Sequence, residues 1–334
     1  MASIITSSAV SRRAFVKGVC GSALAAAVAP GSVRAQASYP SGPIRIIVPW
    51  APGGLVDTGG RVIGDALQEA WGKAVAVENA PGAAGTLGAD KVAKAAADGH
   101  TLLMGTSSIA IDVSTGRKMP FDPLTELTPV GLVADTYSVV VVPPDSPIGS
   151  IGELVAAAKA KPGSLTYGTP GIGSPAHLFV ESFSQVAGIQ MLHVPYGRSQ
   201  AINDLIGGRL SVMFSTVPSA MLHIRNKLVR PLAVTAGRRL SSLADVPTIA
   251  EAGVAGYEAG QWLGVFVPAG TPPDVVGKLN AAITRAVESP SVAQALLARG
   301  LEPRTATPAE FAGVLAAEVR KWSQVIRKGN IKLE

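Results

Sequence analysis

Residues 44–54 read IRIIVPWAPGG, a β-branched run followed by a turn rich in proline and glycine. The run Ile44–Val48 has the composition of a buried strand, and Pro49 ends it because proline lacks the N–H that a strand donates. The two glycines then open a stretch whose apolar residues recur at helical spacing as far as Trp71. The segment therefore predicts a strand, a glycine-rich loop and a helix, the repeating unit of an α/β fold.

The same alternation of short apolar runs and Ala-rich amphipathic stretches continues along the chain. We expect strands at 75–79, 101–105, 138–142, 165–168, 191–194, 212–214, 232–235 and 264–267. We expect helices at 86–97, 151–161, 175–187, 199–207, 273–288, 292–299 and 308–327. This rhythm predicts parallel sheets with helices on both faces.

These elements fall into two α/β halves of similar make-up. The apolar runs near 139–142 and 262–267 are where we expect the chain to cross between the halves. The first domain is then discontinuous, with residues 38–140 and 258–334, and the second domain is 141–257. This arrangement is common where two lobes hinge over a ligand.

The N-terminus reads as an export signal. Residues 11–17, SRRAFVK, fit the twin-arginine pattern, and an apolar run and a small-residue cleavage site near Ala35–Ala37 follow. The apolar run is shorter than the ~20 residues that span a bilayer. We therefore expect residues 1–37 to be removed and the mature protein to reside in the periplasm; the alternative is a basic tail on a cytosolic protein.

Removal of the signal changes the charge and the thiol content. Four basic residues and no acidic residue precede position 38, so the formal charge falls from +6 to +2. With so little excess charge we expect no nucleic-acid partner. The one cysteine, Cys20, leaves with the signal, so neither a disulfide nor a cysteine-ligated metal site is expected. We expect a soluble monomer.

Two glycine-rich loops, each between a predicted strand and a predicted helix, are the strongest candidates for a binding site. Glycine lets the backbone approach a ligand, and N–H groups at a helix N-terminus attract an anion. We interpret the two loops as half-sites for one anionic ligand. The candidate residues are Trp50, Pro52, Gly53, Gly54, Val56 and Asp57 in the first loop, and Thr169, Gly171, Gly173, Ser174 and His177 in the second.

Several of these candidates have a plainer alternative role. Asp57 would complement the helix macrodipole, fix the loop or bind a polar group of the ligand. Trp50 would stack on the ligand or only pack the loop, and His177 would line the site or lock its loop. Further candidates follow predicted strands, at the end where parallel sheets bind ligands: Ser107, Ser108, Tyr196, Ser215 and Thr216.

Catalytic patterns are largely missing from the sequence. The second loop matches the dinucleotide fingerprint in form, yet Pro175 would stiffen the turn where pyrophosphate rests, and the ribose-binding acid expected ~20 residues on is poorly placed. The sequence contains neither a G-x-S-x-G elbow nor a P-loop, and its four histidines lack metal-ligand spacing. We therefore predict a protein that is not an enzyme and has neither a cofactor nor a metal.

Six ordered motifs resemble those of one family. Residues 39–54, YPSGPIRIIVPWAPGG, are similar to the opening of the tripartite tricarboxylate transporter receptors, the Bug or TctC-like proteins. The further matches are VENAPGAAG at 77–85, DGHTLLMG at 98–105, HVPY at 193–196, DVPTIAEAG at 245–253 and PAGTP at 268–272. The resemblance covers essentially the whole chain after the signal.

The resemblance implies a two-lobed periplasmic binding protein, type II-like, in which two doubly wound sheets close over a ligand cleft. It implies that backbone groups and ordered water hold one carboxylate between the loops at 52–57 and 169–174. It also implies delivery of a di- or tricarboxylate or an aromatic acid to a membrane permease. Ser215 stands where members commonly carry an acid, so an amino-acid ligand is less expected.

Two other functions remain open from the sequence. Some members of the family serve sensing, so the protein would then be the ligand-binding partner of a membrane sensor kinase. An exported oxidoreductase with a nucleotide cofactor is the other alternative, because twin-arginine export often carries folded cofactor proteins. A bound cofactor in the purified protein would favour the oxidoreductase, and ligand-dependent capture of a kinase would favour the sensor.

Overall fold

The first three strands run parallel, with β1 between its two neighbours. They are β1 (Ile44–Val48), β2 (Val75–Asn79) and β3 (Thr101–Thr106). The connections between them contain α1 (Leu55–Trp71), η1 (Ala83–Gly85) and α2 (Thr86–Ala93). Helix α1 approaches the sheet closely because its buried face carries glycine; a Cβ at Gly60 would lie 2.9 Å from Val48 Cγ2. The strand, loop and helix predicted from residues 44–54 are confirmed.

Strand β4 (Leu127–Val142) is 16 residues long and pairs with different strands along its length. Its residues 127–137 pair antiparallel with β9 (Gly260–Pro268). Its residues 138–142 pair antiparallel with β7 (Met213–Thr216) and β8 (Arg230–Val234). The short β10 (Glu302–Pro303) completes the order β10-β4-β9-β3-β1-β2.

The main sheet is mixed, so the prediction of wholly parallel sheets is wrong in this detail. Strand β9 runs antiparallel to both of its neighbours, β3 and β4. The reason is that β4 carries the chain away from the first sheet and β9 brings it back alongside, so the two adjacent segments run in opposite directions. The α/β class itself is confirmed.

The segment between β4 and β9 forms a second set of strands and helices. Strands β5 (Thr166–Thr169) and β6 (Leu192–Pro195) pair in parallel. The helices are α4 (Ile151–Ala160), α5 (Pro175–Ala187), α6 (Ala201–Ile206), α7 (Val217–Arg225) and η2 (Ser241–Leu243). Helix α7 is absent from the sequence-based expectation, and it begins directly after β7.

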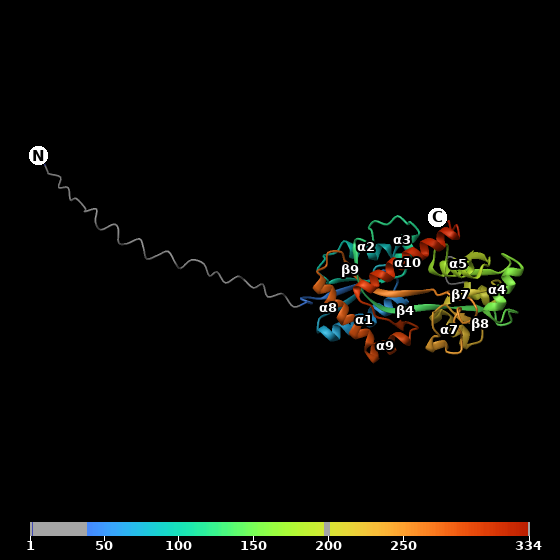
Figure 1. Cartoon of the computed structure of the whole chain (residues 1–334). Helices are drawn as coiled ribbons and strands as arrows, with labels where there is room; N and C mark the ends of the chain where they lie inside the picture. Colours follow the sequence, from blue (N-terminus) through green and yellow to red (C-terminus); the bar gives the residue numbers. More distant parts are fainter. Residues whose placement is uncertain (1, 3–38, 197–200, 333–334) are drawn as a thin grey trace. The chain divides into compact units, whose positions relative to one another are not determined.

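Helices cover both faces of the main sheet, as the alternation of elements predicted. The remaining helices are α3 (Ser108–Ser114), α8 (Pro273–Glu288), α9 (Pro290–Leu297) and α10 (Pro308–Lys328). The helices α1, α8 and α9 pack on one face, and α2, α3 and α10 pack on the other (Figure 1). Helix α10 starts at a capping box in which Thr307 and Glu310 each satisfy a backbone N–H of the other.

Helix α10 contributes to two separate parts of the core. Near its start, Phe311 packs with Phe266 of β9. Near its end, Trp322 belongs to the cluster that contains α5, and its ring stacks on Phe179 with centroids 5.4 Å apart. One continuous helix therefore joins the packing around the main sheet to the packing around β5 and β7.

The computed structural model describes Ala2, residues 39–196 and residues 201–332. The export signal predicted for residues 1–37 lies, apart from Ala2, outside these described residues. Tyr39–Glu334 is one compact unit by its contacts, and the division into domains 38–140 with 258–334 and 141–257 stays a prediction. Within the described residues, no helix has both the length and the apolar character that crossing a bilayer requires.

Candidate functional site

The loops after β1 and β5 line one cavity of about 570 Å³. Residues of α3, of β4 and β9 and of the turn before α7 complete its wall. Most of the lining is apolar or backbone. The lining residues are Trp50, Gly54, Leu55, Val56, Ala84, Thr106, Ser108, Ile111, Asp112, Arg117, Thr136, Pro170, Gly171, Ile172, Gly173, Ser174, Pro175, Ala176, Thr216, Gln261 and Leu263.

Asp57 holds the first loop in place without lining the cavity. Its side chain is buried, and its carboxylate accepts hydrogen bonds from the Gly53 N–H at 2.9 Å and from Asn79 Nδ2 at 2.8 Å. Arg61 donates a third bond from Nε at 3.0 Å. Asn79 also donates to the Trp50 carbonyl oxygen at 3.0 Å. The loop is therefore fixed at both of its ends by one polar cluster.

The charge state of Asp57 follows from these contacts. Burial raises the pKa of a carboxyl group, but the hydrogen bonds from Arg61, Gly53 and Asn79 favour the anion and hold the Asp57 pKa below its usual range. The side chain is therefore ionised at neutral pH. Of the alternatives raised by the sequence, the structure shows Asp57 fixing the loop, and it does not line the cavity.

The second loop is held by side chains of its own segment. Ser174 caps α5 by accepting from the His177 N–H at 3.3 Å, and its hydroxyl donates to the Gly171 carbonyl oxygen at 2.7 Å. Thr169 Oγ1 accepts from the Gly171 N–H at 3.2 Å. Gly171 and Gly173 have φ angles of 156° and 73°, which other residues rarely adopt. The loop is therefore preorganised.

His177 locks this loop from the buried side. Its Nδ1 accepts a hydrogen bond from the Gly173 N–H at 3.1 Å. The His177 ring stacks on the His193 ring with centroids 4.0 Å apart. Burial lowers the pKa of both imidazoles to about 4, so both are neutral at pH 7 and Nδ1 is free to accept. His177 lies outside the cavity lining.

The sequence-predicted site residues divide into three groups. Eight of them line the cavity, namely Trp50, Gly54, Val56, Ser108, Gly171, Gly173, Ser174 and Thr216. Six lie in the loops or behind the wall without lining it, namely Pro52, Gly53, Asp57, Ser107, Thr169 and His177. Tyr196 and Ser215 line a neighbouring pocket of about 230 Å³, which shares Pro170, Ala176 and Thr216 with the cavity.

Two lining residues that carry charge were missed by the sequence analysis. Asp112 lies in α3 and Arg117 lies in the loop that follows it. Arg117 Nη1 lies 3.1 Å from Asp112 Oδ1. Burial raises the Asp112 pKa to about 6, although Arg117 acts in the opposite direction. The one hint in the sequence is that Ser107 and Ser108 follow a predicted strand, which places the end of β3 at the site. That hint does not extend to Asp112 and Arg117, which lie at the far end of the helix that follows.

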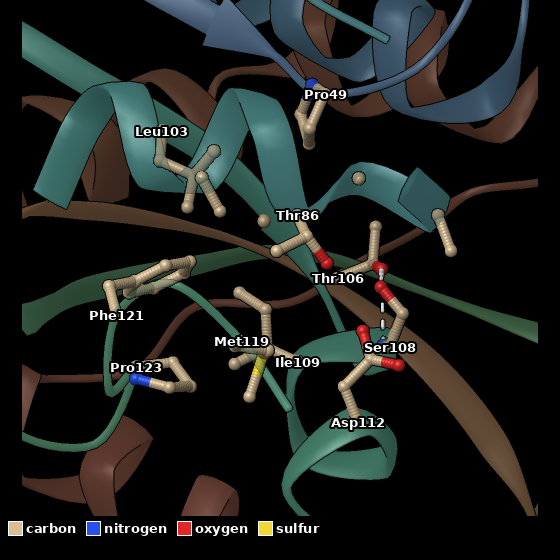
Figure 2. A pocket seen from close by; sticks show the side chains of 14 residues that line it. Pro49, Thr86, Leu103, Thr106, Ser108, Ile109, Asp112, Met119, Phe121 and Pro123 are labelled. Atoms are coloured by element: carbon tan, nitrogen blue, oxygen red, sulfur yellow. Dashed lines mark hydrogen bonds between the residues drawn. The ribbon is translucent and has the colours of Figure 1, made fainter. Parts of the chain in front are cut away.

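A small apolar annex of about 20 Å³ adjoins the cavity at α3. It shares Ala84, Thr106, Ser108 and Asp112 with the cavity. Figure 2 shows Ile109, Met119 and Phe121 around it, and the hydrogen bond of 2.6 Å between the hydroxyls of Thr106 and Ser108 at its mouth. This volume is about the size that one water requires. The annex therefore extends the cavity by no more than a small group.

Helix N-termini meet at the cavity. The lining includes Gly54 and Leu55 at the start of α1, Ser174 and Pro175 at the start of α5, and Thr216 before α7. Each N-terminus carries a partial positive charge and unpaired N–H donors. Among the described residues, no group of three or more His, Cys, Asp or Glu side chains is placed to hold a metal ion. The arrangement suits an anion held by backbone groups.

Comparison with known proteins identifies similar sequences and structures. The sequence model of the tripartite tricarboxylate transporter family receptor matches residues 60–331. The chain is 37% identical to protein BugT of Bordetella pertussis over 300 residues, which cover 89% of this chain and 92% of BugT.

Two solved structures share the fold. R. palustris Rpa4515 with adipate has a TM-score of 0.75 and 34% identity, covering 88% of this chain and 99% of that chain. MatC from Rhodopseudomonas palustris with bound malate has a TM-score of 0.70 and 29% identity, covering 86% of this chain and 100% of that chain. These similarities confirm the predicted fold, a mixed α/β periplasmic binding protein.

Proposed function

This chain belongs to the tripartite tricarboxylate transporter receptor family, and on that premise we propose that it captures a small carboxylate and delivers it to a membrane permease. The family consists of periplasmic solute receptors and not of enzymes. The ligand classes that we propose are di- and tricarboxylates and aromatic acids.

The observation that carries the proposal is the meeting of helix N-termini at the cavity. Gly54 is the N-cap residue of α1 and Thr216 is that of α7, and neither helix receives a hydrogen bond from a capping side chain. Among the described residues, the N–H groups of their first turns therefore lack a side-chain acceptor, with one donor fewer in α7 because Pro218 has no N–H. A ligand carboxylate would supply the missing acceptor and would be favoured by the helix dipoles.

The size and lining of the cavity support a small organic acid. A volume of about 570 Å³ lies within the ~300–1,000 Å³ of small-molecule sites. Trp50, Ile111 and Leu263 offer apolar surface to the body of the ligand. Two proteins of similar structure are described with adipate and with malate, both of which are dicarboxylates.

We propose distinct roles for the two glycine-rich loops. Gly54, Gly171, Gly173 and Ser174 would present backbone or hydroxyl groups to one carboxylate. Asp57, Thr169 and His177 would not contact the ligand and would instead hold the loops in position through their hydrogen bonds. Fixing a loop before binding reduces the entropy that binding must otherwise remove.

We propose two lobes that close over the ligand. One consists of residues 38–140 and 258–334, and the other consists of residues 141–257. What supports this is the course of β4, which pairs with β9 up to Tyr137 and with β7 and β8 from Ser138 onward. The cavity lies between loops of both segments. Strands β4 and β9 would then be the hinge between the lobes.

We propose twin-arginine export for this periplasmic receptor, on the basis of the motif SRRAFVK at 11–17 and cleavage near Ala35–Ala37. Replacing Arg12 and Arg13 with lysine should leave the chain uncleaved in the cytoplasm of the producing cell. Cell fractionation with an antibody to the protein would detect the shift. Cleavage and export of the double variant at the wild-type rate would contradict this part of the proposal.

A thermal-shift screen tests the proposed ligand class. The purified protein is scanned with mono-, di- and tricarboxylic acids and aromatic acids, and with uncharged amides of the same size as controls. A ligand at about 100 times its dissociation constant stabilises the native state by about 2.7 kcal/mol. The proposal predicts a rise in melting temperature with at least one acid and none with its amide; a flat response to every acid would contradict it.

A further inference from the structure

The end of the cavity at α3 carries its ionisable groups. Of the described residues that line the cavity, only Asp112 and Arg117 have charged side chains. The rest of the wall offers apolar side chains, hydroxyls, one amide and backbone groups. Among the described residues of the wall, an anionic group that reaches this end would therefore find one cation, the Arg117 guanidinium.

The backbone directs Arg117 back toward Asp112. Helix α3 ends at Ser114, and Gly116, with a φ of 67°, turns the chain so that the Arg117 N–H donates to the Asp112 carbonyl oxygen at 3.3 Å. The guanidinium then returns over the helix end, where Nη1 lies 3.1 Å from Asp112 Oδ1. Arg117 is thus positioned by its own turn and by one carboxylate.

The guanidinium keeps donors available for a ligand. Half of the Arg117 side chain is exposed, whereas that of Asp112 is only 13% exposed. Among the described residues, Asp112 is the one ion-pair partner of the Arg117 guanidinium. A guanidinium has five N–H donors and suits a carboxylate in bidentate geometry. Most of these donors are therefore open to solvent in the cavity.

We infer that Arg117, held in place by Asp112, binds the second carboxylate of a dicarboxylate whose first carboxylate lies at the helix N-termini; this inference rests on the proposed function. Backbone donors serve the first carboxylate without any side-chain cation. Arg117 then discriminates a diacid from a monoacid, since only the diacid brings a second negative group to α3. Ile111 and Leu263 contact the apolar chain between the two ends.

Asp112 is a positioning residue in this arrangement. Its carboxylate orients the guanidinium and reduces the net charge of the cavity wall. Thr106 and Ser108 lie at the same end and have hydroxyls that pair with each other at 2.6 Å, so they already satisfy part of their own hydrogen bonding. Arg117 is therefore the group at this end whose donors are best matched to a second carboxylate.

Isothermal titration with the full chain tests this inference. Each diacid from succinate to suberate is compared with the monoacid of equal length, from butyrate to octanoate. The variants are Arg117→Gln and Arg117→Lys, and the matched control is Arg239→Gln, which removes an arginine from an exposed pair with Glu251 outside the cavity. The melting temperature of each variant verifies that it is folded.

The wild type should bind its best diacid at least ten times more tightly than the matching monoacid, because a hydrogen bond between a guanidinium and a carboxylate is stronger than one between neutral groups. Arg117→Gln should remove this preference while changing monoacid affinity less than about threefold. Arg117→Lys should retain part of it, and Arg239→Gln all of it.

Two results would overturn the inference and leave the proposed function intact: a wild type that binds diacid and monoacid equally, or an Arg117→Gln variant with the full diacid preference. A wild type that binds no acid of either series would also overturn the inference; the proposed function would fail with it only if tricarboxylic and aromatic acids likewise give no response in the thermal-shift screen.

Discussion

Glu318 of α10 should make the stability of the folded chain depend on pH. Its Oε2 accepts a hydrogen bond from Trp262 Nε1 at 2.8 Å. It lines a polar pocket of about 140 Å³ together with Asp135, Glu258 and Lys321. Burial raises the Glu318 pKa from 4.5 to about 7, although Trp262 and Lys321 act in the opposite direction. The folded protein therefore binds this proton more tightly than the unfolded chain does.

The sign and size of the effect follow from proton linkage. Between pH 4.5 and about 7 the folded state holds more protons than the unfolded state, so the free energy of unfolding decreases as pH rises through this window. A shift from 4.5 to about 7 corresponds to a loss on the order of 3 kcal/mol once pH exceeds 7. Glu318→Gln removes this loss, since glutamine stays neutral and its amide oxygen still accepts from Trp262.

Urea unfolding at pH 5 and pH 8 measures the prediction. From pH 5 to pH 8 the wild type should lose on the order of 3 kcal/mol more stability than Glu318→Gln does. Glu69→Gln, at an exposed position of α1, is the matched control and should follow the wild type. Equal pH dependence in wild type and Glu318→Gln would refute the reasoning and would mean that Glu318 is ionised in the fold at little cost.

Three further predictions concern the cavity. Asp57→Ala removes the acceptor of the Gly53, Arg61 and Asn79 hydrogen bonds. It should lower the unfolding free energy by roughly 2 kcal/mol and reduce carboxylate affinity at least tenfold. Unchanged affinity in calorimetry would count against a role of Asp57 in fixing the loop. Gly53→Val should abolish binding while the fold survives, because a valine at the Gly53 φ of 81° costs about 1–2 kcal/mol and the loop that presents Gly54 shifts to relieve it, whereas the space around the Gly53 Cβ is open; retained affinity would count against the contact proposed for Gly54. Diacid affinity should rise as the pH falls from about 8 toward 6. The reason is that the bound carboxylate raises the Asp112 pKa further above its value of about 6 in the free protein, so that binding takes up a proton. Among the described residues of the cavity wall Arg117 is the other charged group, and Asp112→Asn should give a flat pH profile in the same titration.

The parts of the fold that could be predicted are those whose pattern is local. The run Ile44–Val48 is apolar and buried except for the exposed Arg45, because the strand lies between two neighbouring strands, and proline and glycine follow it where it ends. The starts of α5, α8 and α10 were predicted to within a residue, since each carries proline in its first turn. The residues at the boundary itself decide where such a helix begins, so its start can be predicted from a single sequence.

The first part of β4 could not be predicted in this way. Leu127–Tyr137 contains Pro129, Gly131 and Asp135, which disfavour a strand when considered alone. It is a strand because β9 and β10 pair with it, and the register shifts near Pro129 absorb the irregularity. Helix α2 ends at Ala93, four residues earlier than expected. The Ala-rich sequence continues to Ala97 and gives no signal for this earlier end.

The candidate site was predicted only as far as its loops. Both glycine-rich loops line the cavity, because each follows a strand and opens a helix, and that position is readable from the sequence. His177 could not be assigned to lining or locking, since the contact that decides it is the hydrogen bond from the Gly173 N–H. Arg117 was missed because a turn after α3 brings it to the cavity. The residues next to it in the sequence do not indicate that it lies near the two glycine-rich loops.

A crystal structure of the protein with its tightest-binding acid would locate the ligand carboxylate. We predict one carboxylate within hydrogen-bond distance, about 2.7–3.2 Å, of backbone N–H groups at the start of α1 or in the loop at 171–174, directly or through one water. A carboxylate bound elsewhere on the chain, or held in this cavity by side chains alone with the N–H groups of the α1 N-terminus unoccupied, would contradict it.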